Sequence, residues 1–206
     1  MHTWPGIEAQ ISALSDDIAY HSHDVNDGLR AGLFTIKDLT DVPIIGPIIA
    51  EVQKKYPELQ EGRLFHEIGR RLINMMVNDL LSESSKRLAD AKPNSADDVR
   101  CFGGPLISFS EGFEVDNRSL RKFLFERMYR HYRVNRMTSK ARRVVNDLFK
   151  LYHDEPECLP EEWRPGAEKV SQTDRARHVA DYIAGMTDRF ALDEHRRLYD
   201  VYEESR

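Results

Sequence analysis

The longest helical pattern in the sequence covers residues 63–91, and it limits the possible folds more than any other feature. Its apolar residues recur mostly at spacings of three and four, so they share one face of an α-helix. They are Leu64, Phe65, Ile68, Leu72, Met75, Met76 and Leu80. Residues 7–30 carry a second stripe of the same kind, made by Ile7, Ile11, Leu14, Ile18, Val25 and Leu29. Both segments therefore predict long amphipathic helices.

Shorter patterns divide the rest of the chain into further helices. Gly28 and Gly32 mark the end of the first helix, and Thr35 is suited to cap a short helical turn. The further helices are expected between Pro43 and Pro57 with an interruption at Gly46-Pro47, over 119–135 and 139–153, from a Thr173 cap through Ile183, and over 192–204 with an Asp193 cap. Prolines, glycines and serines break the periodicity over 92–118, so this stretch is predicted as a long loop.

No alternating strand pattern of useful length and no internal repeat occurs in the sequence. We therefore predict an all-α chain of six to eight helices, arranged as an irregular multi-helix bundle. A chain of 206 residues with 40% hydrophobic and 32% charged residues is typical of a globular protein. We expect residues 1–206 to form a single helical domain.

Composition also bears on location and redox environment. No apolar run approaches the ~20 residues of a membrane span, and the first residues do not resemble a secretory signal. Cys101 and Cys158 lie far apart and form neither a zinc spacing nor a disulfide framework. These features favour a reducing, cytoplasmic setting without a membrane partner.

Positive charge is concentrated in residues 121–143, which hold nine Lys or Arg residues and one acid, Glu126. The segment carries a charge of +8, which leaves −13 on the remainder of the chain. Such a segment can bind phosphates, although a solvated helix face is the interpretation we favour. On a helical wheel Arg127, Arg130 and Arg133 drift around the helix, so we expect only weak, non-specific binding of single-stranded nucleic acid.

The stretch "DDIAYHSHD" (16–24) is the most informative about function. With Ile18 at 0° on the helical wheel, Asp16, Tyr20 and Asp24 lie near about 160°, 200° and 240°. They form a polar stripe opposite the apolar one, with successive members about 6 Å apart along the helix axis. This spacing suits one pocket with a carboxylate at its floor, a ring beside it and a second carboxylate at its rim. A solvated helix face is the alternative interpretation.

The same stretch does not make a metal site by itself. A single Asp cannot hold a catalytic divalent ion, which needs several protein ligands. His23 and Asp24 are neighbours whose side chains point about 100° apart, which is a poor grip on one ion. Arg63 is suited to reach a phosphate or to face solvent, and solvation is the interpretation we favour. Asp181 and Tyr182 are interpreted as helix-capping and packing residues.

Three blocks of the sequence resemble the deoxyguanosinetriphosphate triphosphohydrolase-like family of HD-domain phosphohydrolases. The first block is "EAQISALSDDIAYHSHDVNDGLRAGLF" (8–34). The second is "VADYIAGMTDRFALDEHRRLY" (179–199), and "FLFERMYRHYRV" followed by "RRVVNDLFKLY" fits the region between them. The resemblance covers nearly the whole chain in order. It implies the C-terminal part of an HD-domain fold.

The resemblance also implies roles for three residues. Asp16 opens the family pattern DxxxYxxxD and is implied to be the last ligand of a divalent metal ion such as Mg or Mn. Tyr20 is implied to pack against a deoxyribose, where its ring excludes a 2′-hydroxyl. Asp24 is implied to accept a hydrogen bond from the 3′-hydroxyl. A hard carboxylate suits an ion that polarises phosphate oxygens and activates water.

The family's first metal-binding histidine and its His-Asp doublet are expected upstream of this segment, and the sequence does not contain them. The chain is thus expected to be the C-terminal half of a longer metal-dependent enzyme, inactive alone and without a tightly held metal. That enzyme would cleave a deoxynucleoside triphosphate such as dGTP to deoxynucleoside and triphosphate, and the family commonly forms homo-oligomers. A different hypothesis is a non-catalytic helical module that uses residues 121–143 for oligomerisation or for binding a nucleotide or nucleic acid.

Overall fold

The computed structural model describes residues 3–164 and 171–202. Within these residues the chain contains nine α-helices, short 3₁₀ turns, one π-helix and no strand, so the prediction of an all-α protein is confirmed. The chain divides into two compact units, residues 1–131 and 132–206, and each unit is described by itself. Whether the two units make up one domain, as the sequence predicted, is not tested by this division and stays a prediction.

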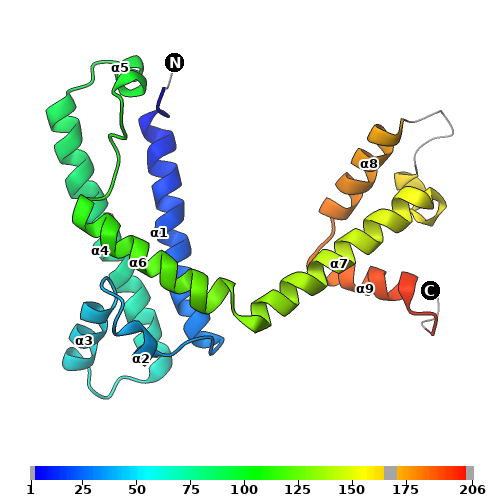
Figure 1. The fold of residues 1–206 in the computed structure, drawn as a ribbon, viewed down its shortest axis with the longest axis horizontal. Helices are drawn as coiled ribbons and strands as arrows, with labels where there is room; N and C mark the ends of the chain where they lie inside the picture. The colour runs from blue at the N-terminus through cyan, green and yellow to red at the C-terminus, as the bar shows by residue number, and fades with distance from the viewer. Residues whose placement is uncertain (1–2, 165–170, 203–206) are drawn as a thin grey trace. The chain divides into compact units, whose positions relative to one another are not determined.

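From residue 3 onward, the first unit contains six α-helices followed by the π-helix (Figure 1). They are α1 (Ile7–Arg30), α2 (Ile36–Leu39), α3 (Gly46–Lys55), α4 (Glu61–Ala91), α5 (Ala96–Cys101), α6 (Glu111–Leu124) and the π-helix η1 (Phe125–Tyr129). The bounds of α1 agree with the sequence prediction, and those of α4 differ from it by two residues at the start. Both helices carry the predicted apolar stripes, whose period is strong enough to locate them.

Helices α1 and α4 pack side by side and run antiparallel, as the colour gradient in Figure 1 allows one to follow. At their contact Ser22 donates its hydroxyl to the carbonyl oxygen of Gly69 at 3.3 Å. The buried residues of the two stripes, among them Ile18, Val25 and Leu72, belong to one core with residues of α3 and α6. Burial of these side chains turns the polar face of α1 away from the core.

The end of α1 is fixed by close packing. Gly28 lies in its last turn, where a Cβ atom would come within 2.3 Å of the Phe34 ring. Phe34 in turn packs edge-on against Phe123 of α6, with ring centroids 5.1 Å apart. Gly32 follows the helix with φ +62°, a left-handed conformation that glycine adopts readily. The predicted end of the helix is confirmed, and Gly28 serves this close approach.

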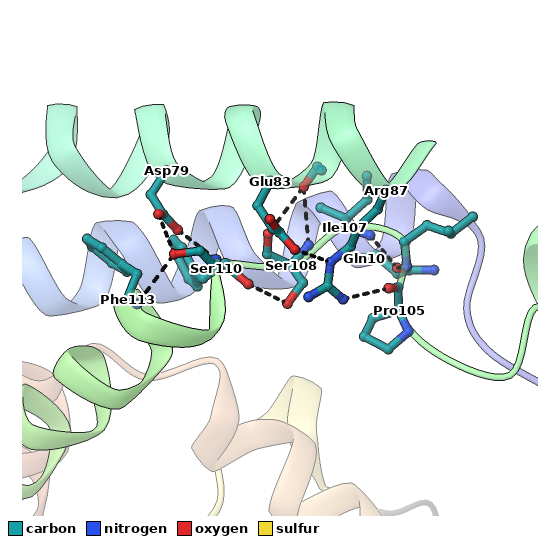
Figure 2. A network of polar contacts seen from close by, with 12 residues as sticks. Gln10, Asp79, Glu83, Arg87, Pro105, Ile107, Ser108, Ser110 and Phe113 are labelled. Carbon is teal, nitrogen blue, oxygen red and sulfur yellow. Dashed lines mark hydrogen bonds and ion pairs between the residues drawn. The ribbon is translucent and has the colours of Figure 1, made fainter. Parts of the chain in front are cut away.

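The stretch predicted as a loop over 92–118 is shorter and more ordered than expected. Helix α5 interrupts it, with Ser95 as its N-cap, and α6 begins at Glu111. Figure 2 shows how the part before α6 is tied to α4. Ser110 donates its backbone N–H and its hydroxyl to the Asp79 carboxylate at 2.8 and 2.7 Å, and Arg87 donates to the Pro105 carbonyl at 3.2 Å.

In its described residues, 132–164 and 171–202, the second unit contains three α-helices, α7 (Tyr132–Asp154), α8 (Gln172–Ala184) and α9 (Asp188–Tyr199). Two 3₁₀ turns, η2 (Pro156–Cys158) and η3 (Glu161–Trp163), follow α7. The α8 and α9 helices both pack against α7 around the buried ring of Tyr152. This ring contacts Tyr182 edge-on at 5.4 Å, and its hydroxyl donates to Glu194 at 3.0 Å. Burial, with the Glu194 carboxylate next, raises the pKa of Tyr152.

Several predicted boundaries were wrong. The helix expected over 119–135 is instead α6, η1 and the start of α7, with a break at Arg130 and His131. Ser171, rather than Thr173, caps α8 by accepting from the Asp174 backbone N–H. Thr187, rather than Asp193, caps α9, and residues 203 and 204 of the predicted last helix lie outside the described residues.

Similar corrections apply to two shorter predictions. The helix expected to open at Pro43 begins at Gly46, with Pro47 in its first turn, whereas the Thr35 cap of α2 is confirmed. Tyr182 packs in the core as predicted, but Asp181 lies inside α8 and caps no helix end. In the described part of the chain, no helix combines the length and the apolar character that crossing a membrane requires.

Candidate functional site

The three predicted site residues lie on the side of α1 that faces away from the core. Asp16 and Tyr20 are exposed, with 60% of Tyr20 accessible, whereas Asp24 is half-buried. No hydrogen bond or ion pair joins Asp16 or Tyr20 to another described residue. The polar stripe predicted from the helical period is therefore present, and its roles in binding stay predictions.

Asp24 has a partner that the sequence did not reveal. Tyr129, the last residue of η1, donates its hydroxyl to Oδ2 of Asp24. Burial and the bond to Asp24 raise the pKa of Tyr129 to about 12. The phenol therefore stays protonated at neutral pH and acts as a donor, which leaves Oδ1 of Asp24 as the second acceptor of this carboxylate.

The π-helix explains why Tyr129 reaches Asp24. The backbone N–H of Arg130 donates to the carbonyl of Phe125, five residues earlier, at 3.0 Å. This wider turn shifts the side chains that follow by about one position relative to an α-helix, and single π-turns occur often at functional sites. No residue type in "FERMY" marks a π-helix, so the sequence alone gave no signal for this contact.

Helix α6 contacts the same side of α1 through an ion pair. The Arg121 guanidinium lies 3.2 Å from Oδ2 of Asp17 and 4.0 Å from Glu114 of its own helix. Together with Tyr129, this contact places α6 and η1 alongside the polar stripe. Arg121 was predicted only as part of a basic helix, and Arg127 similarly pairs with Asp38 at 3.4 Å. These two cations of the basic segment are thus engaged inside the first unit.

His21 lies buried beside these residues, and no described residue hydrogen-bonds its Nδ1. Burial lowers the pKa of His21 below 6.5, and the Arg121 charge lowers it further, against the opposing effect of Asp17, Asp24 and Glu114. Folding therefore favours the neutral imidazole. Its contribution to stability is complete above the unfolded pKa of about 6.5 and is lost as the pH falls below that value.

We expect this histidine to make the first unit sensitive to acid. The melting temperature should fall between pH 7.5 and 5.5, and a His21→Leu variant should show a smaller fall because it has no imidazole to charge. Thermal denaturation across this range measures the difference. His23→Leu, on the exposed face of the same helix, is the matched control. An equal pH slope in the wild type and the His21→Leu variant would contradict the expectation.

The donor groups in the described part of the chain do not by themselves fit a divalent metal ion. Over residues 3–164 and 171–202, no group of three or more His, Cys, Asp or Glu side chains lies close enough together to hold one. Asp16 supplies one hard oxygen donor, whereas a catalytic ion takes several ligands. Arg63 lines a separate cavity of about 360 Å³ with His66 and Glu67.

Comparison with known proteins relates these features to a family. A sequence model of the phosphohydrolase-associated domain matches residues 107–197. Deoxyguanosinetriphosphate triphosphohydrolase-like proteins of Parvibaculum lavamentivorans and Caulobacter vibrioides are each 52% identical to this chain, over 98% and 97% of its length. This chain is similar over nearly its whole length to deoxyguanosinetriphosphate triphosphohydrolase-like proteins.

A third relative with the same name shows a lower identity. The relative from Bordetella pertussis is 46% identical over 97% of this chain. The chain spans about half the length of these curated relatives, with coverage of 51%, 50% and 50% of their sequences. The resemblance inferred from the three sequence blocks is thus confirmed at the level of the family.

Proposed function

We propose that this chain is the C-terminal half of a metal-dependent deoxynucleoside triphosphate triphosphohydrolase, and that α1 carries its deoxyribose site. The observation that carries the proposal is the polar stripe of Asp16, Tyr20 and Asp24, in which Tyr129 donates a hydrogen bond to Asp24. The names of the relatives support dGTP as a substrate. The product pair would be a deoxynucleoside and inorganic triphosphate.

In this proposal Asp24 recognises the 3′-hydroxyl of the sugar. Tyr129 occupies Oδ2 of the carboxylate, so Oδ1 is the acceptor available to a hydroxyl donor. A hydrogen bond to a charged acceptor is stronger than one between neutral groups, and a fixed carboxylate loses less entropy when it forms that bond. The contact with η1 therefore prepares Asp24 for sugar binding.

Tyr20 lies one turn before Asp24 and offers the flat face of an exposed ring. A deoxyribose packed on this ring brings its 2′-carbon against the aromatic surface, where a 2′-hydroxyl would be crowded and poorly solvated. Specificity for deoxyribonucleotides then arises from exclusion of the competing ribonucleotide. Asp16, one turn earlier, would supply a single oxygen ligand to a divalent ion such as Mg or Mn.

The remaining metal ligands are assigned to the half of the enzyme that this chain does not include. An exposed apolar stripe on α4, made by Ile73, Val77 and Leu81, supports this part of the proposal. Contiguous apolar surface of this kind is typical of a face that packs against further protein. By the same reasoning we propose that the chain alone is inactive and that the complete enzyme forms homo-oligomers.

The proposed reaction is tested by analysing products. The full-length protein that contains this chain is incubated with dGTP and Mg or Mn, and anion-exchange chromatography separates the products. Deoxyguanosine and inorganic triphosphate in equal amounts are expected. Formation of dGMP with pyrophosphate, or of dGDP with phosphate, would contradict the proposal. The isolated chain of 206 residues, assayed in parallel, should form no product.

Tyr129→Phe should weaken recognition of the 3′-hydroxyl. The phenylalanine keeps the ring but loses the donor, so Asp24 is no longer held in place. We expect the KM of the full-length enzyme for dGTP to rise about five- to tenfold, the effect of one charge-assisted hydrogen bond. The KM for 2′,3′-dideoxyguanosine triphosphate, which has no 3′-hydroxyl, should not change. Equal changes for both nucleotides would indicate a general structural effect.

The non-catalytic module remains the second hypothesis. The part of its proposed binding segment that lies in the first unit supports it less well than it supports the enzyme. The basic segment 121–143 is divided by the break at Arg130 and His131. Arg121 and Arg127 already pair with Asp17 and Asp38, so only part of the segment is available to an anionic partner. We retain weak, salt-dependent binding of single-stranded nucleic acid as the expectation for the isolated chain.

A further inference from the structure

The second unit contains a cavity between α7 and α9 with a volume of about 620 Å³. This volume falls within the roughly 300–1,000 Å³ typical of small-molecule sites. Val144, which is buried, and Leu192 line it from the two helices. The cavity therefore combines an apolar surface with room for a ligand of nucleotide size.

One wall of the cavity is held in place by a set of mutual contacts. Nε2 of His195 lies 3.0 Å from Oδ2 of Asp147, and the Tyr199 hydroxyl donates to the Asp147 backbone carbonyl at 2.9 Å. The rings of His195 and Tyr199 stack on each other, with centroids 4.7 Å apart and planes 22° from parallel. Two rings fixed in this way present an ordered aromatic surface, which costs little entropy when a planar ligand stacks on it.

The rim of the cavity supplies positive charge. Lys140 and Arg143 lie three residues apart on α7, so they occupy the same side of the helix. Neither forms an ion pair with another residue in the described ranges. The two carboxylates of the cavity, in contrast, have partners within the chain. Asp147 contacts His195, and Asp200 accepts a hydrogen bond from the Tyr202 backbone N–H at 3.1 Å.

The helical wheel drawn from the sequence concerned Arg127, Arg130 and Arg133 and did not include these two cations. Lys140 and Arg143 lie farther along the basic segment, in α7 after the break at Arg130 and His131. Within α7, Lys140 and Arg143 share a cavity, and with Arg136 they also line an adjoining one of about 670 Å³. Cations that lack carboxylate partners and lie beside stacked rings match the two chemical parts of a nucleotide.

We propose that the α7–α9 cavity is a binding site for a nucleotide that carries two or more phosphates. The base stacks on the His195 and Tyr199 rings, and the phosphates bind Lys140 and Arg143. This site belongs to the second unit and does not depend on the proposed role of the α1 stripe.

The proposal is tested by calorimetric titration of the full chain with ADP, a ribonucleotide that the proposed deoxyribose site would reject. ADP should bind, and the Lys140→Ala/Arg143→Ala double variant should bind it about a hundredfold more weakly, about tenfold for each phosphate contact. Arg142→Ala removes one positive charge from a neighbouring position of α7 outside the cavity and should leave the affinity unchanged. Circular dichroism confirms that each variant is folded.

Two further arms test the aromatic part of the site. Pyrophosphate, which has no base, should bind at least about tenfold more weakly than ADP, and Tyr199→Leu should remove that difference. An absence of ADP binding, or equal affinities of the chain for pyrophosphate and ADP, would overturn the proposal. So would a loss of ADP affinity in Arg142→Ala equal to that of the double variant. Binding of a single-stranded oligonucleotide through Lys140 and Arg143 that is much tighter than the binding of ADP would also overturn it.

Discussion

Replacing Asp16 by alanine in the full-length protein should lower kcat for dGTP by at least about a thousandfold, because a group required for the chemistry is lost. Asp16 is the carboxylate that the family pattern assigns to the metal ion, and it is exposed on α1 without a structural partner in the described residues. The substitution should therefore leave the fold intact. Product formation by chromatography and the melting temperature of the variant are the two measurements.

Asp41→Ala is the matched control for this prediction. It removes another exposed carboxylate of the first unit, from a turn outside the polar stripe. Its kcat should equal that of the wild type. If Asp16→Ala retained more than about a tenth of the wild-type kcat while folded, the assigned role of Asp16 in the chemistry would be untenable.

The largest expected effect on stability comes from Leu72, which is fully buried in α4. Leu72→Ala removes part of a side chain from the core shared by α1, α3, α4 and α6 and leaves a cavity. The free energy of unfolding should fall by about 2–5 kcal/mol. Urea denaturation followed by circular dichroism measures the change.

Leu81→Ala tests whether this effect comes from burial. Leu81 lies on the same helix, but 60% of its surface is exposed. The same substitution there should change the free energy of unfolding by less than about 0.5 kcal/mol. Comparable losses in the two variants would mean that Leu72 does not anchor the core as the structure indicates.

The sequence predicted those elements whose information is local and repeated. In α1 and α4 the apolar stripe recurs over many turns, so both helices could be located closely from periodicity. Caps were harder, since Ser171 and Thr173 are both good capping residues two positions apart. The residue that caps the helix is the one whose side chain accepts from the backbone N–H three residues later. Which residue this is depends on where the first helical turn forms, and the sequence does not specify that position.

Long-range contacts account for most of what sequence reasoning missed. The segment before α6 was interpreted as a loop because its order comes from bonds such as Ser110 to Asp79, 31 residues apart. The contact of Tyr129 with Asp24 could not be predicted for the same reason. The two residues are 105 positions apart in the sequence, and the contact depends on a π-helix. Of the candidate site, the sequence predicted the stripe on α1 but not the neighbours that orient it.

Sugar discrimination by Tyr20 variants tests the central claim, that α1 carries a deoxyribose site, most directly. The measurement is the ratio of kcat/KM for dGTP to kcat/KM for GTP in the full-length enzyme. In Tyr20→Ala this ratio should fall about 10- to 100-fold, chiefly because GTP becomes a better substrate once the ring no longer excludes the 2′-hydroxyl. Tyr20→Phe keeps the ring and should keep the wild-type ratio. An unchanged ratio in Tyr20→Ala would contradict the assignment of this stripe to the sugar.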